Sequence, residues 1–141
     1  MTTIFSRIIA GEIPGTFVWT DDVCVAFMSI NPMAPGHVLV VPRAEVAHWI
    51  ELPPATNEHL MRVSQIIGQA QDRAFGCERV GVIIAGYEVP HVHVHVIPTT
   101  NMGQLSFANA AASIERVELD GNADKIRAEL RAVGRPEVTG R

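Results

Sequence analysis

The sequence is poor in cysteine and has no excess of basic residues. The two cysteines, Cys24 and Cys77, form no CxxC pair, so their spacing excludes a sulfur-rich zinc site and a dithiol redox motif. We expect both to be reduced thiols, as is usual in a reducing compartment. Acidic residues outnumber basic ones by 15 to 11, for a formal net charge of −4. A basic face for nucleic acid or an anionic membrane is therefore not predicted, although a substrate can still be anionic.

Long apolar runs and targeting signals are also lacking. The longest apolar runs are strand-length, far below the roughly 20 residues that cross a bilayer. The N-terminus, MTTIFSR, lacks the charged and apolar regions of a signal peptide. We expect a cytoplasmic protein without membrane association, whose 141 residues form a single domain. Its content of 48% hydrophobic and 18% charged residues is typical of a globular chain.

Periodic apolar residues predict five strands and two main helices. Short apolar runs bounded by turn residues predict strands at 17–19, 23–28, 37–41, 79–85 and 89–97. The run at 37–41 is almost wholly apolar, so both of its faces should be covered. Apolar residues at three- and four-residue spacing predict helices over 54–75 and about 120–133, with one or two helical turns at 4–10. Strands in adjacent pairs around one long helix predict an α+β fold with an antiparallel sheet.

Three histidines alternate with valines at residues 91–96. Because side chains alternate between the faces of a strand, His91, His93 and His95 should share one open face while the valines bury against a helix. Packing does not favour such a row, since neighbouring imidazoles cost desolvation and repel one another when protonated. The row therefore indicates a functional site. The other histidines of the central region, His48 and His59, have no partner by spacing and are expected at the surface.

Metal binding is one interpretation of the row. His-X-His on a strand is suitable spacing for two zinc ligands. A zinc ion held by His91 and His93 would still need a third protein ligand, for which His37, Glu45 and Glu88 are candidates.

Phosphate chemistry is the second interpretation. The middle imidazole, that of His93, can attack phosphorus when it is neutral near pH 7. Its neighbours can donate hydrogen bonds to the non-bridging oxygens, whose charge must be stabilised in the transition state. Because the attacking nitrogen needs a free lone pair, the other ring nitrogen must carry the proton and donate it to an acceptor such as a backbone carbonyl.

The same residues carry a resemblance to a known family. The HVHVHVI segment at 91–97 resembles the signature of the histidine triad (HIT) superfamily, and residues 4–14, 22–27, 31–32, 35–42 and Pro98 also fit. The resemblance covers about 4–98 and leaves 99–141 as an extension. It implies a HIT-like fold, in which a five-stranded antiparallel sheet carries one long helix and a C-terminal helix. It further implies a homodimer whose two sheets join into one of ten strands.

The resemblance also implies an activity. Members bind nucleotides, often purine ones, and hydrolyse or transfer nucleotidyl groups at the α-phosphate of substrates such as nucleoside phosphoramidates and dinucleoside polyphosphates. The hydrolase branch needs no metal or other cofactor. By this resemblance His93 is the nucleophile that forms a nucleotidyl-histidine intermediate, and the His91 carbonyl holds its tautomer. His95 would contact phosphate oxygens and His37 would support the site. The candidate nucleotide contacts are Phe5, Ile8, Val18, Phe27, Leu39, Ser29, Ile30 and Asn31.

The chain departs from the family pattern at several positions, which suggests a divergent branch. Ser29 stands where members carry a ribose-binding Asp, and one hydroxyl cannot clamp two ribose hydroxyls as a carboxylate does. Glu88 replaces a hydroxyl residue before the triad; ionised it would repel phosphate, whereas burial would let it act as a general acid. Thr3, Ser6 and Glu45 replace the ligands of a structural zinc in some members, so no such zinc is predicted.

Three hypotheses therefore follow from the sequence. The first is a metal-independent nucleotide phosphoramidase or hydrolase with a purine nucleotide or nucleotide conjugate as its partner. The second is a nucleotide-binding module that has lost turnover through the changes at Ser29 and Glu88. The third is a metalloprotein that uses His91 and His93.

Overall fold

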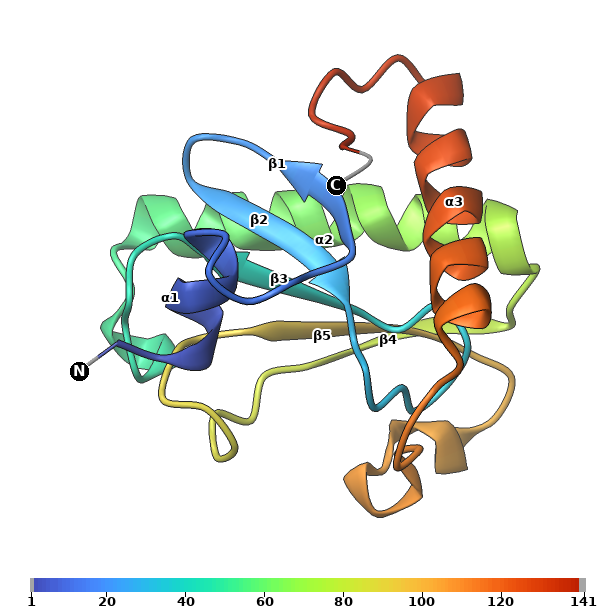
Figure 1. The fold of residues 1–141 in the computed structure, drawn as a ribbon, viewed down its shortest axis with the longest axis horizontal. Coiled ribbons are helices and arrows are strands. Elements are labelled where there is room, and N and C mark those ends of the chain that lie inside the picture. The colour runs from blue at the N-terminus through green and yellow to red at the C-terminus, as the bar shows by residue number, and fades with distance from the viewer. Residues whose placement is uncertain (1, 140–141) are drawn as a thin grey trace.

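The computed structural model describes residues 2–139 and contains a five-stranded antiparallel sheet with helices on both sides (Figure 1). In the order β1-β2-β3-β5-β4 the strands are Phe17–Thr20, Cys24–Met28, Val38–Pro42, Val94–Thr99 and Arg79–Ile83. The helices are α1 (Ile4–Ile9), α2 (Pro54–Phe75) and α3 (Arg116–Ala132), with short 3-10 turns at Trp49–Glu51, Met102–Leu105 and Phe107–Asn109. The predicted α+β class and antiparallel sheet are confirmed.

The predicted strand at 89–97 is wrong at its beginning. The strand β5 starts only at Val94, so His91 and His93 lie in the irregular segment that precedes it. Pro90 has no N–H to donate to a ladder, and the His91 N–H bonds the nearby Val89 carbonyl instead. The Val92 N–H donates to the Val46 carbonyl. The other strands agree within two residues with the predicted ones, and α3 begins four residues earlier than predicted.

Apolar residues fill both sides of the sheet. On one side α2 packs on Val38 and Val40 of β3 and on the valines of β5, and α3 packs on α2 and β1 (Figure 1). On the other side α1 contributes Phe5 and Ile8 to a smaller cluster with Phe27 and Leu39. All five residues of β3 are buried, so the expectation that both of its faces are covered is confirmed. The valine side chains at 92, 94 and 96 join the helix-side core as predicted, because alternation continues into the irregular segment.

A buried glutamine of α2 positions the loop before β3. The Gln71 Nε2 donates to the carbonyls of Gly36 and Val96, each at 2.9 Å. Gly36 adopts φ +90° and lies directly against the ring of Phe75, where a Cβ would collide. This close packing sets where His37, the next residue, enters the sheet.

The two edges of the sheet differ in exposure. At the β1 edge the Thr20 N–H donates to the Glu137 carbonyl and the Arg127 guanidinium donates to the Phe17 carbonyl, so the C-terminal region covers it. At the β4 edge the side chain of Val82 is 45% exposed. Within residues 2–139, no helix combines the length and apolar character that a membrane span requires.

Candidate active site

A cavity of about 270 Å³ lies on the α1 side of the sheet and collects nearly all of the predicted site residues. Of those residues, the ones that line it are Phe5, Ile8, Phe27, Ser29, Ile30, Asn31, His37, Leu39, Glu88, His93 and His95. His91 is fully buried behind the wall, and Val18 packs in the helix-side core. The histidine face is thus enclosed by the N-terminal helix and later segments, which corrects the expectation that it is open.

The backbone carbonyl of His91 fixes the tautomer of His93. The Nδ1 of His93 lies 2.7 Å from that carbonyl, which can only accept, so Nδ1 carries the proton and Nε2 keeps its lone pair. Burial lowers the pKa of His93 below its usual value, partly offset by that hydrogen bond and by the charge of Glu88. The ring of Phe5 contacts His93 edge to face at 4.9 Å. The result is a neutral, oriented imidazole with one free nitrogen.

A relay that starts at a backbone N–H sets the tautomer of His95. The Met33 N–H donates to Nδ1 of His37 at 3.1 Å, so His37 carries its proton on Nε2. That proton is donated to Nδ1 of His95 at 2.9 Å, which leaves His95 with its own proton on Nε2. Burial lowers the pKa of His37 to about 3, helped by repulsion from His95 and His93, and burial lowers the pKa of His95 to about 4, helped by repulsion from His93. His95 therefore presents an N–H donor beside His93, at a ring separation of 4.9 Å.

Both ring nitrogens of His91 bond protein oxygens. Its Nε2 lies 2.7 Å from the Pro42 carbonyl and donates to it, and its Nδ1 accepts from the Thr3 hydroxyl at 2.8 Å. No ring lone pair of His91 is left for an ion shared with His93. This geometry does not favour the hypothesis of a zinc ion on these two histidines, and the part of His91 that reaches the site is its carbonyl.

Thr3, Ser6 and Glu45 form a hydrogen-bonded cluster with His91. One carboxylate oxygen of Glu45 accepts from the Thr3 N–H at 2.7 Å and from the Ser6 hydroxyl at 2.8 Å. The Thr3 hydroxyl accepts from the Ser6 N–H at 3.1 Å as the N-cap of α1. The two hydrogen bonds lower the pKa of Glu45. The cluster ties α1, and with it Phe5, to the segment that carries the triad.

Ser29 and Asn31 both line the cavity and are joined by a hydrogen bond. The Ser29 hydroxyl accepts from the Asn31 N–H at 3.2 Å. The Asn31 amide donates to the carbonyls of Ala111 and Ala112, at 3.2 and 3.0 Å. The Asn31 amide group therefore secures a later segment of the chain.

Glu88 lines the cavity, and its side chain is exposed. The hypothesis that burial makes it a general acid is therefore not supported. A second hollow of about 210 Å³ is lined by Glu88, His93, His95, Phe107 and residues 85–87. His93 and His95 thus lie between two adjoining spaces.

The segment 100–116, which we term the C-terminal strap, contributes to the site although no sequence pattern predicted it. Its Ala111 N–H donates to the Pro32 carbonyl at 2.9 Å. Phe107 packs edge to face on His95 at 5.0 Å, and Arg116 also lines the cavity. The strap lies beyond the part of the chain that carries the family resemblance and has no long periodic element, so no pattern of spacing pointed to it.

His59 is not the isolated surface residue that its spacing predicted. Its Nε2 lies 2.7 Å from Oδ2 of Asp21, which also accepts from the Trp19 indole at 2.8 Å. Cys24 lies beside the same carboxylate, and among the described residues these are the side chains that cluster as a metal site would require. The donors around Asp21 already satisfy it, and they lower its pKa to about 2 against the effect of burial. Neither Cys24 nor Cys77 is paired.

Comparisons with known proteins agree with this geometry. Residues 10–102 match the HIT domain family. An uncharacterised HIT-like protein of Borreliella burgdorferi is 36% identical over 67% of this chain and 73% of its own length. An adenylylsulfatase of Arabidopsis thaliana is 27% identical over 87% of this chain, which spans 64% of that protein.

A solved structure also supports membership of the HIT domain family. The crystal structure of a HIT-like protein from Bartonella henselae, described as involved in cell-cycle regulation, superposes with a TM-score of 0.81 at 31% identity. The superposed region covers 92% of this chain and 96% of the Bartonella henselae chain. The predicted HIT-like fold is confirmed, and the chain belongs to the HIT domain family.

Proposed function

We propose that this protein hydrolyses or transfers nucleotidyl groups at the α-phosphate of a nucleotide conjugate, with His93 as the nucleophile. The observation that carries the proposal is the 2.7 Å hydrogen bond that commits His93 Nδ1 to the His91 carbonyl and leaves Nε2 free. The adenylylsulfatase among its relatives acts on a conjugate of this kind.

The reaction has two steps. The Nε2 lone pair of His93 attacks the α-phosphorus, the N–P bond forms, and the bond from phosphorus to the leaving group breaks with its electron pair going to that group, which takes up a proton from solvent if it is an amine. Water then attacks the phosphorus of the nucleotidyl-histidine, the N–P bond breaks, and the nucleoside monophosphate leaves with His93 restored. The Nε2–H of His95 donates to a non-bridging oxygen in both steps, where charge accumulates in the transition state.

The two spaces beside the histidines suggest where the parts of the substrate bind. The 270 Å³ cavity offers Phe5, Ile8, Phe27 and Leu39 to a purine base. The smaller hollow at residues 85–88 would take the leaving group. The Glu88 carboxylate there favours a neutral or cationic leaving group, such as an amine, over an anionic one, because like charges repel. It also stabilises the positive charge that His93 acquires in the intermediate.

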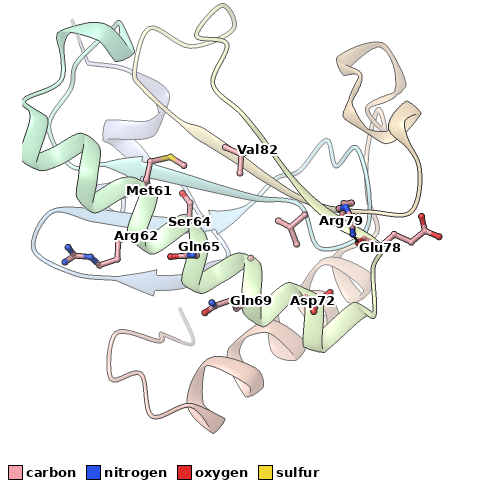
Figure 2. A pocket seen from close by; sticks show the side chains of 11 residues that line it. Met61, Arg62, Ser64, Gln65, Gln69, Asp72, Glu78, Arg79 and Val82 are labelled. Atoms are coloured by element: carbon pink, nitrogen blue, oxygen red, sulfur yellow. Dashed lines mark hydrogen bonds between the residues drawn. The ribbon is translucent and has the colours of Figure 1, made fainter.

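Dimerisation is part of the proposal. The β4 edge is open and lies beside a groove formed with α2, whose lining includes Met61, Gly68 and Val82 (Figure 2). Met61 and Val82 are 42% and 45% exposed. Unpaired edges recruit another strand. We propose that β4 of a second copy pairs here, which would join two sheets into one of ten strands.

A phosphoramidate assay tests the enzyme hypothesis against the binding module. Adenosine 5′-phosphoramidate is incubated with the protein in EDTA, and release of adenosine monophosphate is followed. We expect release by the wild type and none by His93→Ala, with His48→Ala as the matched control at an exposed histidine. Equal rates in wild type and His93→Ala would refute the proposed nucleophile. Nucleotide binding without release by the wild type would favour the binding module, and activity that EDTA abolishes would favour the metalloprotein.

A further inference from the structure

The C-terminal strap brings a single cationic side chain to the cavity. Two sets of hydrogen bonds hold the strap to the loop after β2: Ala111 N–H to the Pro32 carbonyl, and the Asn31 amide to the carbonyls of Ala111 and Ala112. The strap ends at Arg116, the first residue of α3, which lines the cavity together with Ser29 and Asn31. The strap therefore completes the cavity wall and determines what the ligand meets there.

The described lining of the cavity includes two charged side chains of opposite sign. Among the described residues that line it, Glu88 and Arg116 are the only Asp, Glu, Lys or Arg side chains. Glu88 also belongs to the smaller hollow beside His93 and His95, whereas Arg116 does not. Among the described residues, no carboxylate other than that of Glu88 lines the cavity, and the Asp120 carboxylate contacts Arg116 from outside the lining. An anionic group held away from the triad would find its favourable partner at Arg116.

The guanidinium of Arg116 has N–H groups that are available to bind a ligand. Its Nε is 3.2 Å from Oδ2 of Asp120, and that contact is exposed at the surface, where an ion pair contributes little. The Nη1 and Nη2 groups make no hydrogen bond that would occupy them in the described structure. Two parallel N–H groups match the geometry of a phosphate. In dinucleotide-binding proteins, a carboxylate selects a free ribose hydroxyl and an arginine accepts a ribose phosphate.

We propose that Arg116 forms a second anion subsite, which binds a phosphate carried on the 2′- or 3′-hydroxyl of the nucleotide. The preferred substrates are then nucleotide conjugates with a ribose phosphate in addition to the reacting 5′-phosphate. The subsite rests on the proposed function, because it assumes that the nucleotide binds with its 5′-phosphate facing His93 and its ribose toward Arg116. Ser29 fits the same ligand, since its neutral hydroxyl donates to a ribose or phosphate oxygen without repelling it.

Calorimetric binding of adenosine 5′-monophosphate, adenosine 2′,5′-bisphosphate and adenosine 3′,5′-bisphosphate tests the subsite at one fixed salt concentration. We expect one bisphosphate to bind wild type about tenfold more tightly than the monophosphate, as one charged hydrogen-bonded contact provides. Arg116→Gln should remove this advantage and leave monophosphate binding within about twofold. Arg131→Gln, at an exposed arginine of the last turn of α3, is the matched control and should keep the advantage.

Two results would overturn the subsite. One is that neither bisphosphate binds wild type more tightly than the monophosphate. The other is that Arg116→Gln weakens all three ligands equally, which would mean that the arginine acts on the cavity as a whole. The phosphoramidate assay separates the two proposals: a bisphosphate preference without turnover refutes catalysis and leaves the subsite intact, whereas turnover without the preference refutes the subsite alone.

Discussion

At the scale of single residues, protonation in this site is decided by backbone groups. A carbonyl directs His93, and the Met33 N–H directs His95 through His37. Burial lowers the pKa of His37, His93 and His95, so all three are neutral. His37 has both ring nitrogens committed to hydrogen bonds, whereas His93 and His95 each have one committed. The nitrogen that remains is an acceptor on His93 and a donor on His95, which are the two functions that phosphoryl transfer requires.

Removal of the His37 relay should affect turnover more than binding. In His37→Phe, the Met33 N–H loses its buried acceptor and His95 Nδ1 loses its donor, so His95 is free to change tautomer. We expect a loss of about 1–3 kcal/mol in the free energy of unfolding from the unpaired group. The kcat should fall while KM changes little. A KM effect that exceeds the kcat effect would indicate that His37 serves the ligand pocket instead.

Acid should destabilise the fold well above the pH at which carboxylates titrate. Folding lowers the pKa of His37 to about 3 and of His95 to about 4, so the unfolded chain binds protons first as pH falls. Their stabilising contribution is complete above the unfolded value near 6.5 and declines from there toward pH 4. Asp21, with its pKa lowered to about 2, loses its contribution only below about pH 4. Urea unfolding at pH 7.5, 5.5 and 4.5 measures this decline, which should be shallower in His37→Phe.

At the scale of elements, α1 depends on the Glu45 cluster. A helix of six residues does not persist alone in water, and here Thr3, Ser6 and Glu45 connect its start to His91. The helix in turn supplies Phe5 to the cavity and to the face of His93.

Loss of the Glu45 carboxylate should therefore loosen the cavity wall. In Glu45→Ala, the Thr3 N–H and the Ser6 hydroxyl lose their acceptor. We expect faster amide hydrogen exchange in α1 and a higher KM for the nucleotide. Glu45→Gln keeps an acceptor oxygen and should restore much of the binding, and Glu51→Ala serves as a control at another exposed carboxylate. Unchanged exchange in α1 would show that the apolar contacts of Phe5 and Ile8 alone hold the helix.

At the scale of the whole molecule, the asymmetry of the sheet edges directs assembly. The C-terminal region covers β1, while β4 remains available beside exposed apolar side chains of α2. A charge introduced at β4 should oppose pairing because it would be buried without a partner.

Val82→Glu should therefore produce a monomer with an intact cavity. Val117→Glu is the matched control, because Val117 is 81% exposed on α3, away from the β4 edge. Light scattering during size-exclusion chromatography gives the mass of each variant. A wild type that is monomeric would refute the proposed dimer, and a dimer that survives Val82→Glu would exclude β4 as its interface.

Much of the fold and of the site was predictable from local pattern. The period of apolar residues indicated α2 to the residue, and the alternation at 91–96 separated histidines from valines correctly even where no regular strand forms. Both signals are properties of neighbouring residues and need no knowledge of the rest of the chain. The motif at 91–97, together with the matching segments before it, predicted the HIT-like fold by resemblance.

The sequence by itself thus determined the family, the elements and the identity of the histidines. Tertiary structure decided the burial of the histidines, their tautomers and the part of the cavity wall that the C-terminal strap forms, because these depend on partners distant in the chain. Thr3 and His91 are 88 residues apart, and His37 and His95 are 58 apart. Arg116 reaches the cavity only because the strap folds back onto Asn31. Hydrogen-bond partners over such separations leave no periodic trace in a sequence, so only the folded chain reveals which ring nitrogens of His93 and His95 remain free.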